Sequence, residues 1–304
     1  MALSTKVIKN RIRSIGNTKK ITKAMEMVSA VKMRKSVNAV LNSRAYAQTA
    51  WSVVLNLAKR INAQDHPLLN RRESLKKTAV ILISSNRALC GGFNSQIINK
   101  ALNYAANEKS ESQEFIVMGK KGAEFLARLK KDVVAEFDKP DMLVSAEDIA
   151  PIVKMVIKDF IDGKYDKVSV AYTDYISALV QKPRVLTLLP FSIAEDKDLG
   201  SVNKTSQKEN EETNQGIDSL EYVFEPNKDE ILNLFLPRLI ETQLYQAMLE
   251  SLASEHSARM MAMKNASSSA SDMIADLTLM FNQARQAGIT REIAEICGSK
   301  AALE

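Results

Sequence analysis

The sequence predicts an α/β protein in which a long antiparallel two-helix coiled coil, made from the two ends of the chain, carries a Rossmann-like parallel sheet domain. Residues 2–66 contain no proline and one glycine, and residues 238–287 contain neither residue type. Between these stretches, short apolar runs rich in β-branched residues alternate with segments of helical spacing. That alternation is typical of a parallel sheet with crossover helices.

The N-terminal helix is expected over residues 1–64, because Asp65-His66-Pro67 resembles a turn. Apolar residues recur within it at steps of three and four, which places them on one stripe of a helix. A single long helix cannot bury such a stripe by itself and needs a partner. The residues assigned to the stripe include Ile8, Ile12, Ile15, Ile21, Met25 and Val28.

The C-terminal helix is expected over residues 228–304 and is the natural partner. Fifty residues without a helix breaker would extend ~75 Å. Steps that average three and a half residues mark the seam of a left-handed coiled coil. The residues assigned to this seam include Met273, Leu277, Met280, Ala284, Ile289, Ile293 and Ile296.

The middle of the chain, residues 75–224, is expected to form the Rossmann-like domain. Ser145, with Asp148 three positions later, is expected to cap a helix. Residues 195–219 are polar, acidic and free of aromatic residues, which predicts a mobile insertion. Strands are expected over 78–85, 114–118, 132–137, 167–172, 184–189 and 220–224, and helices over 95–107, 123–129 and 146–162, with a turn at 119–122.

Charge is distributed unevenly along the 304 residues. Residues 1–44 carry eleven Lys or Arg against one acid, Glu26, and this tract is an electrostatic handle for an anionic partner. Its first aromatic residue is Tyr46, which disfavours single-stranded nucleic acid, whereas duplex backbone binding stays open. No apolar run approaches the ~20 residues of a membrane span.

Few residues suggest catalytic chemistry. The loop at Gly91-Gly92 follows an expected strand but matches neither GxGxxG nor GxxxxGK[ST], so we interpret it as a tight turn. Cys90 has no neighbouring base in sequence. His66 and His256 lie far from each other and from any cysteine partner, and we interpret both as surface polar residues. We therefore expect no catalytic residue, no metal site and no cofactor.

Four segments resemble a known family. Residues 17–34 (NTKKITKAMEMVSAVKMR), 85–94 (SNRALCGGFN), 253–263 (ASEHSARMMAM) and 282–296 (NQARQAGITREIAEI) occur in the order found in the γ subunits of F-type ATP synthases. The resemblance implies the same fold and the role of a central rotor shaft, which couples proton-driven rotation of a membrane ring to ATP synthesis on the β subunits. It implies a subunit that is not an enzyme by itself.

The resemblance also implies partners and a location. The partners are three α and three β subunits, the ε subunit and the ring of c subunits, with no nucleic acid. The implied location is peripheral, on the cytoplasmic face of the bacterial cell membrane, through the complex. The sequence departs from the usual family pattern at Asn86, Ala88, Ser299 and Lys300.

Seven positions match family positions that contact other subunits or affect coupling. Each could instead be an ordinary solvated flank of a coiled coil. Lys23 and Met25 match positions that face an acidic loop of β, Arg285 and Gln286 match positions that engage a β loop near the shaft top, and Arg259, Thr290 and Glu292 match positions important for coupling.

Two other functional classes remain open from the sequence. The first is a coiled-coil protein that binds nucleic acid or an anionic membrane through its basic N-terminal helix. The second is a small-ligand enzyme built on the α/β domain. Co-purification with α and β subunits would separate both from a rotor shaft.

Overall fold

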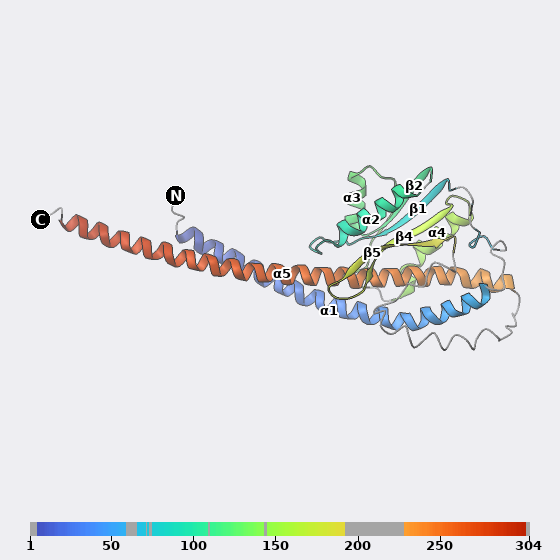
Figure 1. Cartoon of the computed structure of the whole chain (residues 1–304), viewed down its shortest axis with the longest axis horizontal. Coiled ribbons are helices and arrows are strands. Elements are labelled where there is room, and N and C mark those ends of the chain that lie inside the picture. The colour runs from blue at the N-terminus through green and yellow to red at the C-terminus, as the bar shows by residue number, and fades with distance from the viewer. Residues whose placement is uncertain are drawn as a thin grey trace. The chain divides into compact units, whose positions relative to one another are not determined.

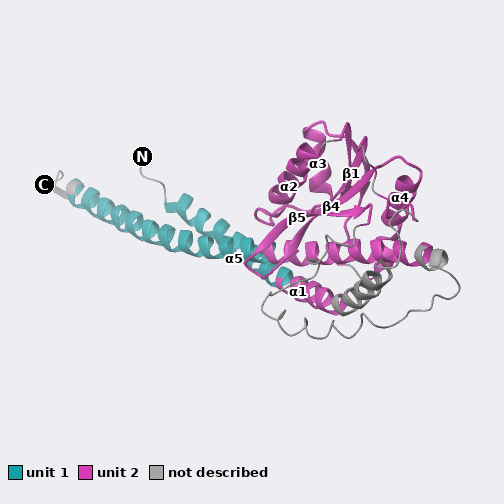
Figure 2. Ribbon diagram, turned by 45° about the vertical axis from the view of Figure 1, so that its right-hand side comes forward, with its two compact units in different colours: residues 1–29, 259–304 teal, residues 30–258 magenta. Residues whose placement is uncertain are grey.

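The computed structural model describes residues 5–58, 66–70, 72, 75–108, 110–142, 145–191 and 228–301. The chain divides into two compact units (Figure 2). Unit 1 comprises Met1–Ser29 and Arg259–Glu304, and unit 2 comprises Ala30–Ala258. Helices α1 (Thr5–Ala58) and α5 (Lys228–Ala301) each contribute to both units.

Unit 1 is a pair of helices formed by the two ends of the chain. The N-terminal part of α1 and the C-terminal part of α5 lie side by side and run in opposite directions, and α5 extends past the start of α1 (Figures 1 and 2). The predicted antiparallel pairing is therefore confirmed in this unit. Side chains buried there include Ile8, Thr22, Met263, Ser267 and Ala270.

The face of α1 that is buried differs from the predicted stripe. Ile21 and Val28 are 60% and 56% exposed, so their assignment to the stripe is wrong. Between Ile8 and Ser36 the buried positions instead follow a seven-residue spacing and are mostly small and polar. The distance between packed helices depends on the side chains at their contact, so small residues permit close approach. These positions are Ile8, Thr22, Ser29 and Ser36, with Ile15 half-buried between the first two.

Unit 2 is built on a five-stranded sheet of order β3-β2-β1-β4-β5 (Figure 1). Strands β1 to β4 are parallel, as predicted, whereas β5 is antiparallel to β4. The physical reason is the connection between them, since five residues suffice for a hairpin but not for a crossover. The strands are β1 (Lys77–Ile83), β2 (Ser112–Met118), β3 (Val133–Phe137), β4 (Lys167–Tyr175) and β5 (Gln181–Leu189).

Helices cover both faces of the sheet. The alternating side chains of the strands divide between two apolar clusters, one with α2 (Phe93–Asn107) and α3 (Lys120–Arg128). The other cluster includes α4 (Ala150–Ile161), α5 and Val40 of α1. The sheet domain is thus packed directly on the long C-terminal helix.

The ends of several elements test the sequence interpretation. Ser145 and Asp148 form the predicted capping box, at the start of the short 3-10 helix η1 (Ala146–Asp148) that precedes α4. The predicted turn over 119–122 is wrong, because α3 already begins at Lys120. The predicted strand 220–224 and the insertion 195–219 lie outside the described residues.

Candidate functional site

The seven predicted contact residues all belong to unit 1. Lys23 is exposed and forms an ion pair with Glu26, with 3.0 Å between Nζ and Oε1. Met25 is half-buried on the same turn of α1. Exposed pairs of this kind contribute little to stability. The Lys23 ammonium therefore costs little to redirect toward another chain.

The exposed side of α1 in unit 1 is strongly basic. Residues 5–29 hold seven Lys or Arg, all exposed, and one acid, the half-buried Glu26. A surface of one sign attracts an oppositely charged partner over a distance without demanding a fixed contact geometry. The cations are Lys6, Lys9, Arg11, Arg13, Lys19, Lys20 and Lys23.

The predicted residues on α5 fall into two classes. Arg285, Gln286, Thr290 and Glu292 are exposed within about two turns of the helix. The Thr290 hydroxyl donates to the Gln286 carbonyl at 2.9 Å, a bond inside the helix. Arg259 differs, since it is only 8% exposed and has interactions within the chain. The first group is therefore accessible at the surface of the chain, whereas Arg259 is packed within it.

Large apolar side chains are exposed along both helices of unit 1, and sequence reasoning did not anticipate this. The assignment of two of them to the stripe and of five to the seam is therefore wrong, namely Ile21 and Val28, and Met273, Met280, Ile289, Ile293 and Ile296. Extended apolar exposure marks surfaces that bind other proteins. The exposed residues are Ile21, Met27, Val28, Met273, Leu279, Met280, Ile289, Ile293 and Ile296.

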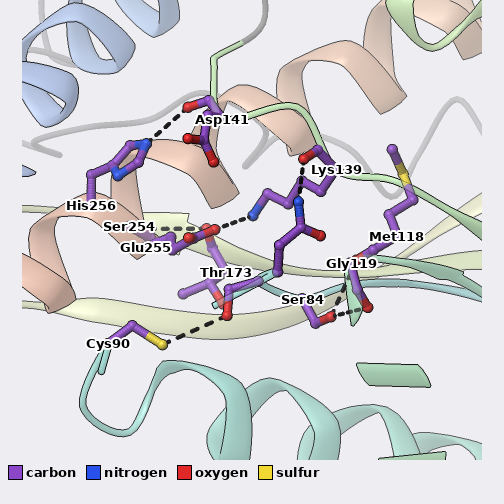
Figure 3. Close-up of polar contacts among 12 residues, drawn as sticks. Ser84, Cys90, Met118, Gly119, Lys139, Asp141, Thr173, Ser254, Glu255 and His256 are labelled. Carbon is purple, nitrogen blue, oxygen red and sulfur yellow. Dashed lines mark hydrogen bonds and ion pairs between the residues drawn. The ribbon is translucent and has the colours of Figure 1, made fainter. Parts of the chain in front are cut away.

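At the carboxyl end of β2, the N-terminus of α3 is occupied by the chain itself. The first three N–H groups of α3 donate to the Asn86 side chain (3.3 Å), the Ser85 carbonyl (3.0 Å) and the Ser84 hydroxyl (2.9 Å). Asn86 also donates to the Lys139 carbonyl at 2.6 Å. Helix N–H groups that are already bonded are not offered to an anion. Figure 3 shows Ser84 beside Gly119 at this end.

Cys90 and the two histidines are buried and form hydrogen bonds within the chain. Cys90 is buried, and its sulfur accepts a hydrogen bond from Asn94 at 3.3 Å. The interpretation of both histidines as surface residues is wrong. His66 is buried and pairs with the Asn233 side chain at 3.1 Å, and the buried His256 pairs with the Asp141 carbonyl at 3.0 Å.

A buried ion pair also escaped sequence reasoning. Lys139 Nζ lies 2.7 Å from Glu255 Oε2, with side-chain exposures of 2% and 9% (Figure 3). The ammonium also lies 5.3 Å from the centre of the Phe93 ring. Lys139 stands between Asp138 and Pro140 in a polar loop, so nothing in the local sequence signals its burial.

Two features are absent from the described residues. These residues contain no group of three or more His, Cys, Asp or Glu side chains suited to a metal ion. In the same part of the chain, no helix combines the length and apolar character needed to cross a membrane.

Comparison with known proteins assigns the chain to a family. A family model described as ATP synthase matches residues 4–303. The ATP synthase gamma chain of Pelotomaculum thermopropionicum is 41% identical over 301 residues, which cover 99% of each chain.

Two solved structures are similar in fold. A chain from the central stalk/c-ring structure of the Tetrahymena thermophila mitochondrial ATP synthase has a TM-score of 0.59 at 25% identity, over 81% of this chain and 99% of that one. A chain of the Euglena gracilis mitochondrial ATP synthase has a TM-score of 0.67 at 17% identity, over 99% and 94%. The comparisons give no support to a nucleic-acid-binding or membrane-binding coiled-coil protein. On the family match and the full-length identity, the chain belongs to the family of ATP synthase gamma chains.

Proposed function

We propose that this chain is the central rotor shaft of an F-type ATP synthase. It would couple proton-driven rotation of the membrane ring to ATP synthesis at the catalytic sites of the β subunits. The observation that carries the proposal is unit 1, a two-helix rod with an exposed basic face and exposed apolar side chains. Such a rod can attract an oppositely charged partner without an interlocking interface, which suits a surface that must move past its partners.

The chain acts in this proposal as a non-catalytic subunit. Its partners are three α and three β subunits around unit 1, and the ε subunit and the ring of c subunits beside unit 2. Its association with the membrane is peripheral and runs through the complex. We place it on the cytoplasmic face of the bacterial cell membrane.

The contact residues follow from the same proposal. We assign Lys23 and Met25 to the moving acidic loop of β, because an exposed ammonium and a flexible apolar side chain both tolerate a changing partner. We assign Arg285 and Gln286 to a second β loop. Thr290 and Glu292 would support that contact on the next turn. Arg259 would stabilise the packing of the two helices around it.

Co-expression with the α and β subunits tests the proposal. The wild-type chain should co-purify with both and support ATP-driven proton pumping after reconstitution with the membrane ring. The charge reversal Lys19→Glu/Lys20→Glu should weaken association and pumping. The matched control Lys154→Glu/Lys158→Glu reverses two exposed cations of α4 in unit 2 and should behave as wild type in both measurements.

Two results would count against the proposal. A wild-type chain that binds duplex DNA or anionic vesicles but neither α nor β would contradict the function itself. Equal behaviour of the two charge-reversal variants would contradict the role of the basic face, because the same change of net charge would then act wherever it is placed.

A further inference from the structure

Consecutive residues in one turn of α5 make polar contacts with the sheet domain, each from a different side of the helix. The hydroxyl of Ser254 donates to the Thr173 carbonyl on β4 at 3.1 Å. The hydroxyl of Ser257 donates to the Ala178 carbonyl in the β4–β5 connection at 2.7 Å. Both hydroxyls reach outside their own helix, whereas a serine within a helix commonly bonds to the preceding turn of the same helix.

The two residues between them bond to a different part of unit 2. Glu255 pairs with Lys139 at 2.7 Å, and His256 pairs with the Asp141 carbonyl at 3.0 Å. Both partners belong to the loop after β3. The Asp141 side chain in turn pairs with Lys32 of α1 at 2.9 Å, so this loop contacts both long helices. Figure 3 shows its contacts with Glu255 and His256.

The geometry of a helix gives this arrangement a mechanical meaning. Successive residues are separated by about 100° around the axis, so the four side chains of Ser254–Ser257 point in directions that span the circumference. All four are buried, with exposures of 0%, 7%, 3% and 0%. A rotation of α5 about its axis, or a slip along it, would stretch these bonds together. Apolar packing is non-directional and resists such sliding less.

We propose that Ser254–Ser257 is the turn at which torque passes between α5 and the sheet of unit 2. The inference rests on the proposed function as a rotor shaft. α5 continues without a break from this turn into unit 1. Ala258 is the last residue of unit 2 before that crossing, so a twist carried along α5 reaches unit 2 at these four residues first.

The test is Ser254→Ala/Ser257→Ala in the full chain, reconstituted with its partner subunits in vesicles. Two measurements are compared: the rate of ATP hydrolysis, and the largest opposing proton gradient against which pumping continues. Hydrolysis should stay within about twofold of wild type, since the hydrolytic sites lie on other subunits. The loss of one hydrogen bond should increase about fivefold the fraction of molecules in which the Ser254–Ser257 turn is detached from the sheet. Pumping should therefore stop at a lower opposing proton gradient.

The matched control is Ser271→Ala. Its hydroxyl donates to the Ser267 carbonyl inside α5, at 3.0 Å, so the same chemical change removes no bond to the sheet. This control should pump to the wild-type limit. The single variants Ser254→Ala and Ser257→Ala should each give an intermediate limit, and they replace the double variant should it fail to assemble.

Two outcomes would overturn the inference. In the first, the double variant melts at a lower temperature but pumps to the wild-type limit, which would make these bonds structural only. In the second, Ser271→Ala lowers the limit as much as the double variant does. A wild-type complex that hydrolyses ATP without pumping would instead refute the proposed function, and with it this inference, before any variant is compared.

Discussion

The hydroxyl of Ser84, the residue that follows β1, accepts a hydrogen bond from the backbone N–H of Gly122 in the first turn of α3, at 2.9 Å. The same hydroxyl lies 2.9 Å from the Gly119 carbonyl, to which it can donate. Gly119 stands at the N-cap of α3 and has no side chain to cap the helix. A neighbouring strand therefore supplies the cap that the local sequence lacks.

Ser84→Ala should destabilise unit 2 without unfolding the chain. The substitution leaves the Gly122 N–H without its partner in a buried site, and loss of such a cap costs about 1 kcal/mol. Denaturant unfolding of the isolated chain measures the change. Ser95→Ala is the control, because its hydroxyl donates to the Gly92 carbonyl at an exposed position. An equal loss in the free energy of unfolding of the two variants would show that the Ser84 hydrogen bond contributes no more than an exposed one.

Two glycines should respond in opposite directions to the same substitution. Gly119 has a φ of +103°, and an added Cβ would lie 2.6 Å from the Ser84 carbonyl oxygen, so Gly119→Ala should be strongly destabilising. Gly16 lies inside α1, and apart from its chain neighbours and the adjacent helix backbone no atom lies within 4 Å of an added Cβ. Gly16→Ala should stabilise the isolated chain by about 0.5–1 kcal/mol. Thermal unfolding of both variants measures the difference, and a stabilised Gly119→Ala would contradict the strain argument.

Much of the fold could be predicted because its signals are local. The absence of helix breakers over both ends indicated α1 and α5, and the run 78–85 indicated β1. The spacing of Ser145 and Asp148 predicted the capping box. These features depend on backbone propensity and on side chains a few positions apart, which a single sequence contains.

The rest depends on which surfaces meet. Ile21 is more apolar than Thr22, yet Thr22 is buried and Ile21 is exposed, because close packing of α1 on α5 selects small side chains. The burial of His256 and Lys139 depends on partners more than a hundred residues away in the chain. In the candidate site, the family resemblance identified Arg285 and its neighbours. The exposure of the large apolar residues could not be predicted, because an apolar stripe on a helix is normally expected to be buried.

Asp166 should make unit 2 sensitive to acid. Burial alone would raise the pKa of its carboxyl, but hydrogen bonds from the Lys77 N–H, the Arg72 guanidinium and the Lys76 N–H outweigh burial and lower the pKa below its ordinary value. A carboxyl with a lowered native pKa contributes stability above its unfolded pKa and loses that contribution as the pH falls through the native value. The free energy of unfolding should therefore decline from about pH 5 downward.

Asp166→Asn tests this dependence directly. The variant should be less stable at neutral pH and should lose less further stability than wild type between pH 5 and strongly acidic conditions, because a neutral amide binds no proton there. Denaturant unfolding at a series of pH values measures both effects. Asp138→Asn removes one carboxylate that is 79% exposed and serves as the matched control. An acid dependence that persists unchanged in Asp166→Asn would exclude the assignment.

Ala270→Leu should weaken the helix pair of unit 1. Ala270 is 6% exposed in the seam, and an added isobutyl group would overpack it at a cost of about 1–3 kcal/mol. Ala275→Leu makes the same change at an exposed position of α5 and should be nearly neutral. Hydrogen exchange along residues 5–29 should accelerate in the first variant only. Unchanged protection in Ala270→Leu would mean that the seam can open without cost.

Met25→Lys should impair coupling more than folding. Met25 is half-buried, so a lysine stem can cover the same neighbours while its ammonium reaches water. The new charge would lie beside the pair formed by Lys23 and Glu26, at the surface that we assign to an acidic loop of β. A stronger attraction at one angular position opposes movement to the next, because every position must be left as easily as it is reached. ATP-driven pumping should therefore fall relative to hydrolysis, while the melting temperature of the isolated chain changes by only a few degrees.

The control for that variant is Met27→Lys, which adds the same charge at a side chain that is 59% exposed and about 200° further around α1. The net charge of the two variants is identical, so a general electrostatic effect on assembly would lower pumping equally in both. An effect confined to Met25→Lys would instead depend on the face of the helix, as a sliding contact requires. Unchanged pumping in Met25→Lys would remove this residue from the contact surface and leave the basic face of α1 as a site of attraction alone.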